Sequence, residues 1–249
     1  MELGEIRENT YGTLMKIIRI KDSSDIDVEF LDEHHFIKTH VTYSNFVRGS
    51  IKNPYDKTIY NVGYFGVGDV ESSKNGETTP VYNCWMNMIG RCYEDKYKEK
   101  YKSYYQISQV CAEWLNFQNF GKWYEENKYD VDGRLHLDKD ILYSGNKIYS
   151  PYHCLLVPQR INMLFTNKPN SNGLPNGIRK TSIGYKATYN TTKLGTFNSL
   201  EGAYSAYAKE KERCIKEIAE EYRNIIPQKL YIALLNYKVR IETDKNLIL

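Results

Sequence analysis

The sequence predicts an α+β fold made of three modules. Some segments alternate apolar and polar side chains, which is the period of a half-buried strand, and others place apolar residues three and four positions apart, which is the period of a helix. Two polar stretches, 71–80 and 166–173, have the composition of linkers. We therefore expect modules at residues 1–70, 80–168 and 174–249.

The composition predicts a folded protein without a membrane span. Of the 249 residues, 41% are hydrophobic and 14% aromatic, which is enough apolar surface to offset the entropy lost on ordering. No apolar run approaches the roughly 18 residues that a membrane span needs, and the N-terminal MELGEIREN is too polar for a secretory signal. We therefore expect a cytoplasmic protein with no membrane partner.

The charge of the chain is only mildly basic. A net charge of +3 and a pI of about 8.4 fall short of the strongly basic domains typical of nucleic-acid binding, so any basic surface must be local. The 23 tyrosines have two interpretations, either amphipathic rings of core and surface or side chains that stack on bases and contact phosphates.

Cysteines and histidines give no clear metal motif. An odd count of five cysteines in a chain without a secretory signal argues against a disulfide framework, and the absence of a C-x-x-C pair argues against the close ligand pairs of zinc sites. We expect buried thiols rather than a zinc site made from Cys84, Cys92, Cys111 and Cys154. The three neighbouring histidines, His34, His35 and His40, have two interpretations. They are either metal ligands or, more simply, surface residues of a hairpin.

The first module is predicted to be a small antiparallel sheet or barrel, with strands at 14–20, 26–30 and 35–39. The second opens with a predicted helix over 82–93 and continues with helical spacing over 110–123. Between them, lysines and tyrosines interleave over 96–102, a pattern that suits either a polyanion or a solvated helix end.

The third module is predicted to be a three-stranded sheet backed by one long helix. The strands are expected at 177–181, 185–189 and 193–197. A turn at 190–192 joins the last two, and Asn198 or Ser199 is expected to cap the helix. Beyond Pro227 we expect an amphipathic segment at 230–237 and a strand at 239–242.

Residues 135–165 form the segment best suited to carry chemistry. The predicted order is a strand, a turn, a returning strand, a loop and a short helix, at 135–138, 144–146, 147–149, 150–151 and 158–165. This is the layout of a ββα-metal finger, in which a carboxylate on the first strand and a polar side chain on the helix hold one divalent cation. Such a cation stabilises the charge that develops on a phosphodiester during cleavage.

Residues 82–165 resemble the HNH endonuclease family of phages and mobile introns, which includes homing endonucleases. The resemblance rests on C-W-x-x-M-x-x-R-C-Y from Cys84, V-C-x-E-W-x-x-F-x-x-F from Val110, L-D-K-D from Leu137, Y-S-P from Tyr149, Cys154, and Ile161-Asn162. It implies a nuclease that cuts double-stranded DNA with Mg²⁺ or another divalent cation. A phage-encoded protein of this kind would work in the host cytoplasm.

The resemblance also implies roles for individual residues. Asp138 and Asn162 would hold the cation, and Asn146 or His153 would take the central structural position of the loop.

The position of the catalytic base departs from the family pattern. The family's histidine follows the metal-binding carboxylate directly, but Lys139 stands there, and a protonated lysine accepts no proton from water. His136 shares a strand face with Asp138 and is the candidate replacement. The alternative is a half-buried histidine beside a degenerate site.

Residues 177–207 resemble the ethylene-response-factor type of DNA-binding domain. The matching features are G-I-R from Gly177, Y-K-A from Tyr185, L-G-T-F from Leu194 and A-Y-x-A-Y from Ala203, although Tyr185 and Leu194 replace the family's usual tryptophans. In that family the sheet lies in the DNA major groove. The candidates for contact are Arg179, Lys180, Tyr185, Lys186, Tyr189 and Lys193, of which strand alternation places about half on the helix side.

Two functions follow from these features. The first is a phage-type HNH endonuclease that the C-terminal domain positions on DNA. The second is a catalytically degenerate relative that binds DNA or blocks a host defence protein. A module whose aromatic residues form only core is the third interpretation.

Overall fold

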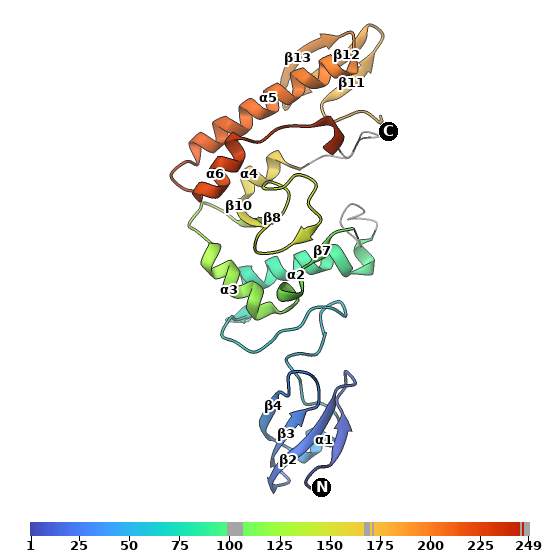
Figure 1. The fold of residues 1–249 in the computed structure, drawn as a ribbon, viewed down its shortest axis with the longest axis vertical. Helices are drawn as coiled ribbons and strands as arrows, with labels where there is room; N and C mark the ends of the chain where they lie inside the picture. The colour runs from blue at the N-terminus through green and yellow to red at the C-terminus, as the bar shows by residue number, and fades with distance from the viewer. Residues whose placement is uncertain (99–106, 167–169, 171, 245, 247–249) are drawn as a thin grey trace. The chain divides into compact units, whose positions relative to one another are not determined.

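The computed structural model describes residues 1–98, 107–166, 170, 172–244 and 246. Helices and strands both contribute, which confirms the α+β class (Figure 1). The chain forms two compact units, residues 1–123 and 124–249. The boundary between the units therefore lies inside the second predicted module rather than between residues 168 and 174.

The first unit begins with an antiparallel sheet whose strands follow chain order, β1 (Ile6–Glu8), β2 (Leu14–Asp22), β3 (Asp25–Phe30) and β4 (Ile37–Val41). The apolar residues Met15 and Ile17 of β2 and Ile26, Val28 and Phe30 of β3 are buried, for β3 in the alternation that the sequence predicted, and they pack with Phe46 of α1 (Tyr43–Val47). Thr42 caps α1 by accepting the N–H of Asn45.

The rest of the first unit is mainly helical. A small hairpin, β5 (Ser73–Lys74) and β6 (Glu77–Thr78), occupies the predicted linker. It leads into α2 (Pro80–Tyr93), η1 (Asp95–Tyr97), β7 (Gln109–Val110), η2 (Ala112–Leu115) and α3 (Phe117–Asn127). The Trp85 indole donates to the Trp114 carbonyl at 2.8 Å, which ties α2 to η2. Residues 99–102 of the lysine and tyrosine run lie outside the described residues.

The second unit contains a strand–strand–helix arrangement, β8 (Leu135–Asp138), β10 (Leu155–Pro158) and α4 (Gln159–Leu164). The prediction that 147–149 forms the returning strand was wrong, because the antiparallel partner of β8 is β10 and residues 148–149 form the separate strand β9 (Ile148–Tyr149). The physical reason is burial, since Leu156 and Val157 are almost fully buried while Ile148 is exposed.

A three-stranded antiparallel sheet follows, β11 (Ile178–Thr181), β12 (Gly184–Tyr189) and β13 (Thr192–Phe197), and α5 (Leu200–Glu221) packs on it. These elements agree with the predicted ones. Of the two candidate caps, the structure selects Ser199, whose hydroxyl accepts the N–H of Gly202.

The C-terminal segment differs from its prediction in one element. Helix α6 (Gln228–Leu235) follows Pro227 as expected, but residues 239–242 form no strand and the segment ends in η3 (Ile241–Thr243). The reason is that the Val239 N–H donates to the Glu212 carboxylate of α5 at 3.0 Å instead of to a strand.

Two hydrophobic cores lie inside the second unit, and α5 contributes to both. The sheet core contains Ile178, Ala187, Ala203, Tyr204 and Tyr207. We call residues 135–165 the finger. The finger core contains Ile141, Val157, Ile161, Ile215, Ala219 and residues of α6. Because the finger buries its apolar residues against α5 and α6, residues 135–165 and the C-terminal sheet belong to one compact unit.

Candidate active site and nucleic-acid interface

His136 and Asp138 lie on the side of the β8–β10 hairpin that faces the finger core. Asp138 is paired with Leu155, and His136 with Val157. Residues directly opposite each other in an antiparallel pair point to the same face. Because Leu155 and Val157 pack in the finger core with Ile161 of α4, both candidate residues lie on the face that α4 covers.

The Asp138 carboxylate is oriented by the turn that follows β8. Its Oδ1 accepts the N–H of Asp140 at 2.8 Å and the N–H of Ile141 at 2.7 Å, whereas its Oδ2 accepts no hydrogen bond from the described residues. Burial raises the pKa of Asp138 to about 6, against the smaller opposing effect of the backbone donors. One carboxylate oxygen is therefore unengaged, which fits the chemistry of a hard divalent cation.

Lys139 has a structural role. Its side chain is 5% exposed, and its ammonium donates to the Asp140 carboxylate at 2.9 Å and to the Asn146 carbonyl. Lys139 therefore holds the loop after β8 in place through its ammonium group.

Asn146 closes the loop after β8. Its amide donates to the carbonyl of Lys139 at 2.9 Å and to the carbonyl of Ile148 at 2.8 Å. Its oxygen accepts the Ile148 N–H at 3.1 Å. One side chain thus joins both ends of the turn that contains Gly145.

His153, the other candidate for that position, lies at the next turn of the loop. Its Nδ1 is 2.6 Å from the hydroxyl of the buried Ser150, and its ring meets that of Tyr143 edge-on. Both contacts fix the imidazole plane, and the turn leads directly into β10.

Tyr237 lies close enough to Asp138 to be affected by its charge, whereas among the described residues no contact joins the Asn162 side chain to Asp138. Asn162 follows the buried Ile161 on α4, which packs against both strands of the hairpin. Tyr237 packs on the same core, with its ring 4.8 Å from that of Phe165 between centroids. Burial, and after it the charges of Asp138 and Asp140, raise the pKa of Tyr237. Sequence reasoning missed Tyr237, because only the return of the chain after α6 places it there.

The outer face of the C-terminal sheet is basic. Arg179 lies opposite Lys186 of β12, and Lys193 lies opposite Thr188 after a bulge. Ile178 and Ala187 point the other way, into the sheet core. Arg179, Lys186 and Lys193 therefore share the outer face, whereas exposed Lys180 lies opposite Tyr185 and so on the other side of the sheet. No ion pair among the described residues involves these four.

The two tyrosine candidates belong to the inner side of the sheet. Tyr189 is 8% exposed and packs edge-on against Tyr207 at 5.6 Å, which is a correction to its predicted place on DNA. Tyr185 is half-buried against the same core. The strand register shows which of the candidates face the helix, because alternation in the sequence alone does not say which face of the sheet the helix covers.

A charge pattern that composition concealed runs through the finger and the sheet. Residues 141–200 contain seven Lys and Arg and no Asp or Glu. This stretch supplies β10, α4 and the whole three-stranded sheet. The overall charge of +3 is small only because acidic residues lie elsewhere, and a window of net charge along the sequence would have found the stretch.

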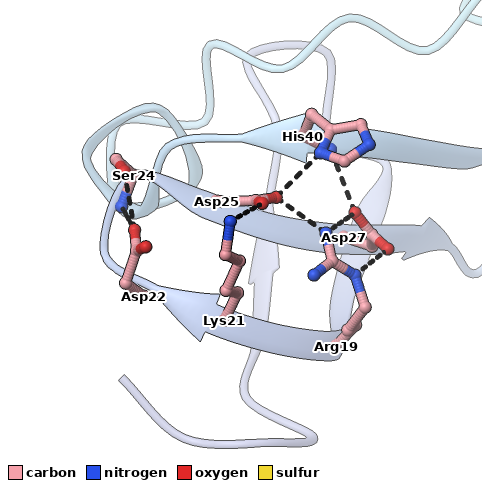
Figure 2. A network of polar contacts seen from close by, with 7 residues as sticks. All are labelled: Arg19, Lys21, Asp22, Ser24, Asp25, Asp27 and His40. Atoms are coloured by element: carbon pink, nitrogen blue, oxygen red, sulfur yellow. Dashed lines mark hydrogen bonds and ion pairs between the residues drawn. The ribbon is translucent and has the colours of Figure 1, made fainter.

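A second group of metal-ligand type lies in the N-terminal sheet, where the ligand atoms of Asp25, Asp27 and His40 lie within 4.8 Å of one another (Figure 2). Arg19 already pairs with both carboxylates, at 2.7 Å to Asp25 and through two nitrogens to Asp27. The Arg19 guanidinium lowers the pKa of Asp27 to about 2 and that of Asp25 as well. The arginine therefore neutralises charge that a cation would otherwise meet.

Sequence reasoning missed this network, although D-I-D over 25–27 places both carboxylates on one strand face. The three predicted histidines separate. His40 joins Asp25 at 2.9 Å, His35 contacts Glu29, and the ring of His34 stacks on that of Tyr55.

The cysteines form no disulfide in the described part of the chain. Among the described residues they also take no part in a group of possible metal ligands, since Asp25, Asp27 and His40 form the group found there. Cys92 and Cys154 are buried, whereas Cys84, Cys111 and Cys214 are half-buried.

Comparison with protein-family models, with curated proteins and with solved structures gave no match. None of the helices in the described ranges has the length and apolarity needed to cross a membrane.

Proposed function

We propose that the chain is a DNA endonuclease of the HNH type that holds duplex DNA on β11–β13 and cleaves it at Asp138 with one divalent cation. The observation that carries the proposal is the acid-free stretch 141–200, which supplies both the finger and the sheet with seven basic residues. DNA phosphates are attracted to a surface built from such a stretch. Strand β10 of this stretch pairs with β8, and β8 ends at Asp138, whose Oδ2 is unengaged.

Asp138 and Asn162 are the residues that would hold the cation, and Mg²⁺ or Mn²⁺ suits a carboxylate and an amide oxygen. Bound there, the cation supplies Lewis-acid stabilisation of the charge that develops on the phosphodiester and on its leaving oxygen. The two backbone N–H donors keep the carboxylate plane fixed during this change.

His136 is the proposed base. It lies on the same hairpin face as Asp138, two residues away, and a neutral imidazole accepts a proton from water near neutral pH. Lys139 and Asn146 act at a distance from the reacting atoms, because their hydrogen bonds hold the loop that follows the carboxylate.

The basic face of the sheet binds the substrate. Arg179, Lys186 and Lys193 neutralise phosphates at the edge of a groove, and a strand ribbon is narrow enough to enter the major groove of B-DNA. This part of the function requires no cation.

The second candidate function, a binding protein without catalysis, is favoured by one observation. Lys139 is buried in an ion pair at the position where the family has its base. Such a protein would bind DNA, or a host protein, whether or not a divalent cation is present.

Plasmid nicking with Mg²⁺ or Mn²⁺ decides between the two. The wild type is expected to nick, and Asp138→Ala to lose more than the about 10–100-fold that removal of an outer-shell partner costs. Asp25→Ala is the matched control, since it removes a carboxylate from the other metal-ligand group and is expected to nick like the wild type. Equal nicking by wild type and Asp138→Ala, or tight duplex binding without nicking, would contradict the proposal.

A further inference from the structure

Helix α5 is shared by the two cores of the second unit. Near its start, Ala203, Tyr204 and Tyr207 are buried in the sheet core. Near its end, Ile215 and Ala219 are buried in the finger core. A single helix therefore carries the basic sheet at one end and the ββα finger at the other (Figure 1).

The C-terminal segment joins the same two cores a second time. Tyr237 packs on the finger core, and Val239 and Ile241 pack on the sheet core. Between these contacts, Glu212 of α5 accepts the Val239 N–H at 3.0 Å and the Lys238 ammonium at 3.1 Å. Two antiparallel connections resist bending better than one.

The middle of α5 has the features of a stiff helix. Residues 203–221 of α5 contain neither glycine nor proline. Arg213 pairs with Glu210 at 2.7 Å and with Glu217, which are the three- and four-residue spacings that stabilise an exposed helix. Nothing in this stretch provides a hinge.

We propose that α5 is a ruler that fixes the distance along the DNA between the duplex held by the sheet and the phosphate presented to Asp138. From Tyr204 to Ala219 the helix rises by about 22 Å, at about 1.5 Å per residue. At about 3.4 Å per base pair this corresponds to roughly six or seven base pairs. The strand break then falls at one offset, within about one turn of DNA from the bound site. The position of the break rests on the proposed function, whereas the spacing itself rests only on DNA binding.

A lengthened variant tests the ruler. Seven residues inserted after Lys209 add two helical turns, about 10 Å, and keep both faces of α5 in register to within about 20°. Three residues inserted after Lys238 lengthen the extended return segment by a similar distance. The break is expected to move by about three base pairs. The three-residue insertion alone is the matched control, which leaves α5 unchanged and is expected to leave the offset unchanged.

Photocrosslinking reads the offset without requiring cleavage. Tyr143 is 55% exposed on the finger loop, so solvent offers room for the larger benzophenone side chain of Tyr143→p-benzoylphenylalanine, which places a crosslinker beside the duplex. Footprinting locates the base pairs that the protein covers, and the position of the crosslink is counted from them. The crosslink is expected at one position in the wild-type background and about three base pairs further in the lengthened variant.

The outcomes separate the two proposals. A crosslink that moves in a protein that never nicks supports the ruler and overturns the endonuclease. A nick that stays at the same offset in the lengthened variant overturns the ruler alone. If that variant does not fold, crosslinks of the unlengthened protein spread over many positions overturn the ruler, and crosslinks at one position support it. A protein that binds no duplex overturns both.

Discussion

Asp138 is a residue whose burial costs stability. Its folded pKa of about 6 lies above its ordinary value, so the folded state binds a proton that the unfolded chain releases between these values. The contribution of Asp138 to the free energy of unfolding is therefore highest in acid, where its carboxyl is protonated in both states, and this contribution is lost as the pH rises through about 6. A buried carboxylate retained under these conditions is typical of a functional position.

The substitution Asp138→Asn is expected to stabilise the protein at neutral pH. An asparagine keeps an oxygen for the two N–H donors and does not ionise. In EDTA at pH 8, the free energy of unfolding should rise by on the order of 2 kcal/mol, and at pH 4 it should match the wild type. Urea unfolding at both pH values measures this, and an equal change at both would show that ionisation of Asp138 is not the cause.

The sequence predicted the residue types of the site better than their roles. Asp138 lies at the end of a strand, as the alternating pattern over 135–138 predicted, and Asn146 closes the loop that follows. Lys139 was recognised as a departure, but its contact with the Asn146 carbonyl depends on the loop folding back, which no local pattern indicates. Tyr237 is about 100 residues away in sequence and is placed only by tertiary packing.

At the scale of elements, strand register decides which side chains of the C-terminal sheet reach solvent. The sequence predicted all three strands and the helix cap, because alternation and capping are local signals. It did not predict that β10 pairs with β8, nor the bulge after Ala187 that keeps Lys193 on the outer face. Pairing between distant strands depends on which segments bury apolar surface together.

The basic sheet face should bind DNA electrostatically. Arg179→Ala and Lys186→Ala are each expected to weaken duplex binding and to reduce the slope of log affinity against log salt by about 1. Lys229→Ala, an exposed lysine on α6, is the control and should change neither. Fluorescence anisotropy across a KCl series gives the slopes. Equal slopes for all four proteins would mean that DNA lies elsewhere.

The turn between β11 and β12 requires glycine. Gly184 has φ +137°, and a Cβ there would lie 2.3 Å from the carbonyl oxygen of Phe197. Gly184→Ala is therefore expected to destabilise the fold by about 1–3 kcal/mol or more. Gly145 also has a positive φ, 78°, but an added Cβ there would lie in open space. Gly145→Ala should therefore lower the free energy of unfolding by less than Gly184→Ala does. Thermal unfolding compares them, and equal losses would show that the contact with Phe197 is relieved.

At the scale of the whole molecule, the chain consists of two compact units, each with cores of its own. The sequence predicted three modules because polar stretches mark linkers. It did not reveal that Ile215 and Ala219 of the long helix belong to the finger core, since a buried helix face does not indicate its partner.

Core substitutions should therefore act on separate units. Ile215→Ala is expected to destabilise the second unit by about 2–5 kcal/mol, and Ile17→Ala the first unit by a similar amount. Calorimetry should show each substitution shifting a different unfolding transition. A single transition that both substitutions shift equally would show that the two units unfold as one.

The central claim is that Asp138 and Asn162 share a divalent cation beside bound duplex. A crystal of the DNA complex soaked with Mn²⁺ tests it through the anomalous signal of the metal. We expect a Mn²⁺ peak within about 2.5 Å of Asp138 Oδ2 and of the Asn162 amide oxygen. No Mn²⁺ at Asp138, or Mn²⁺ bound only among Asp25, Asp27 and His40, would contradict the claim.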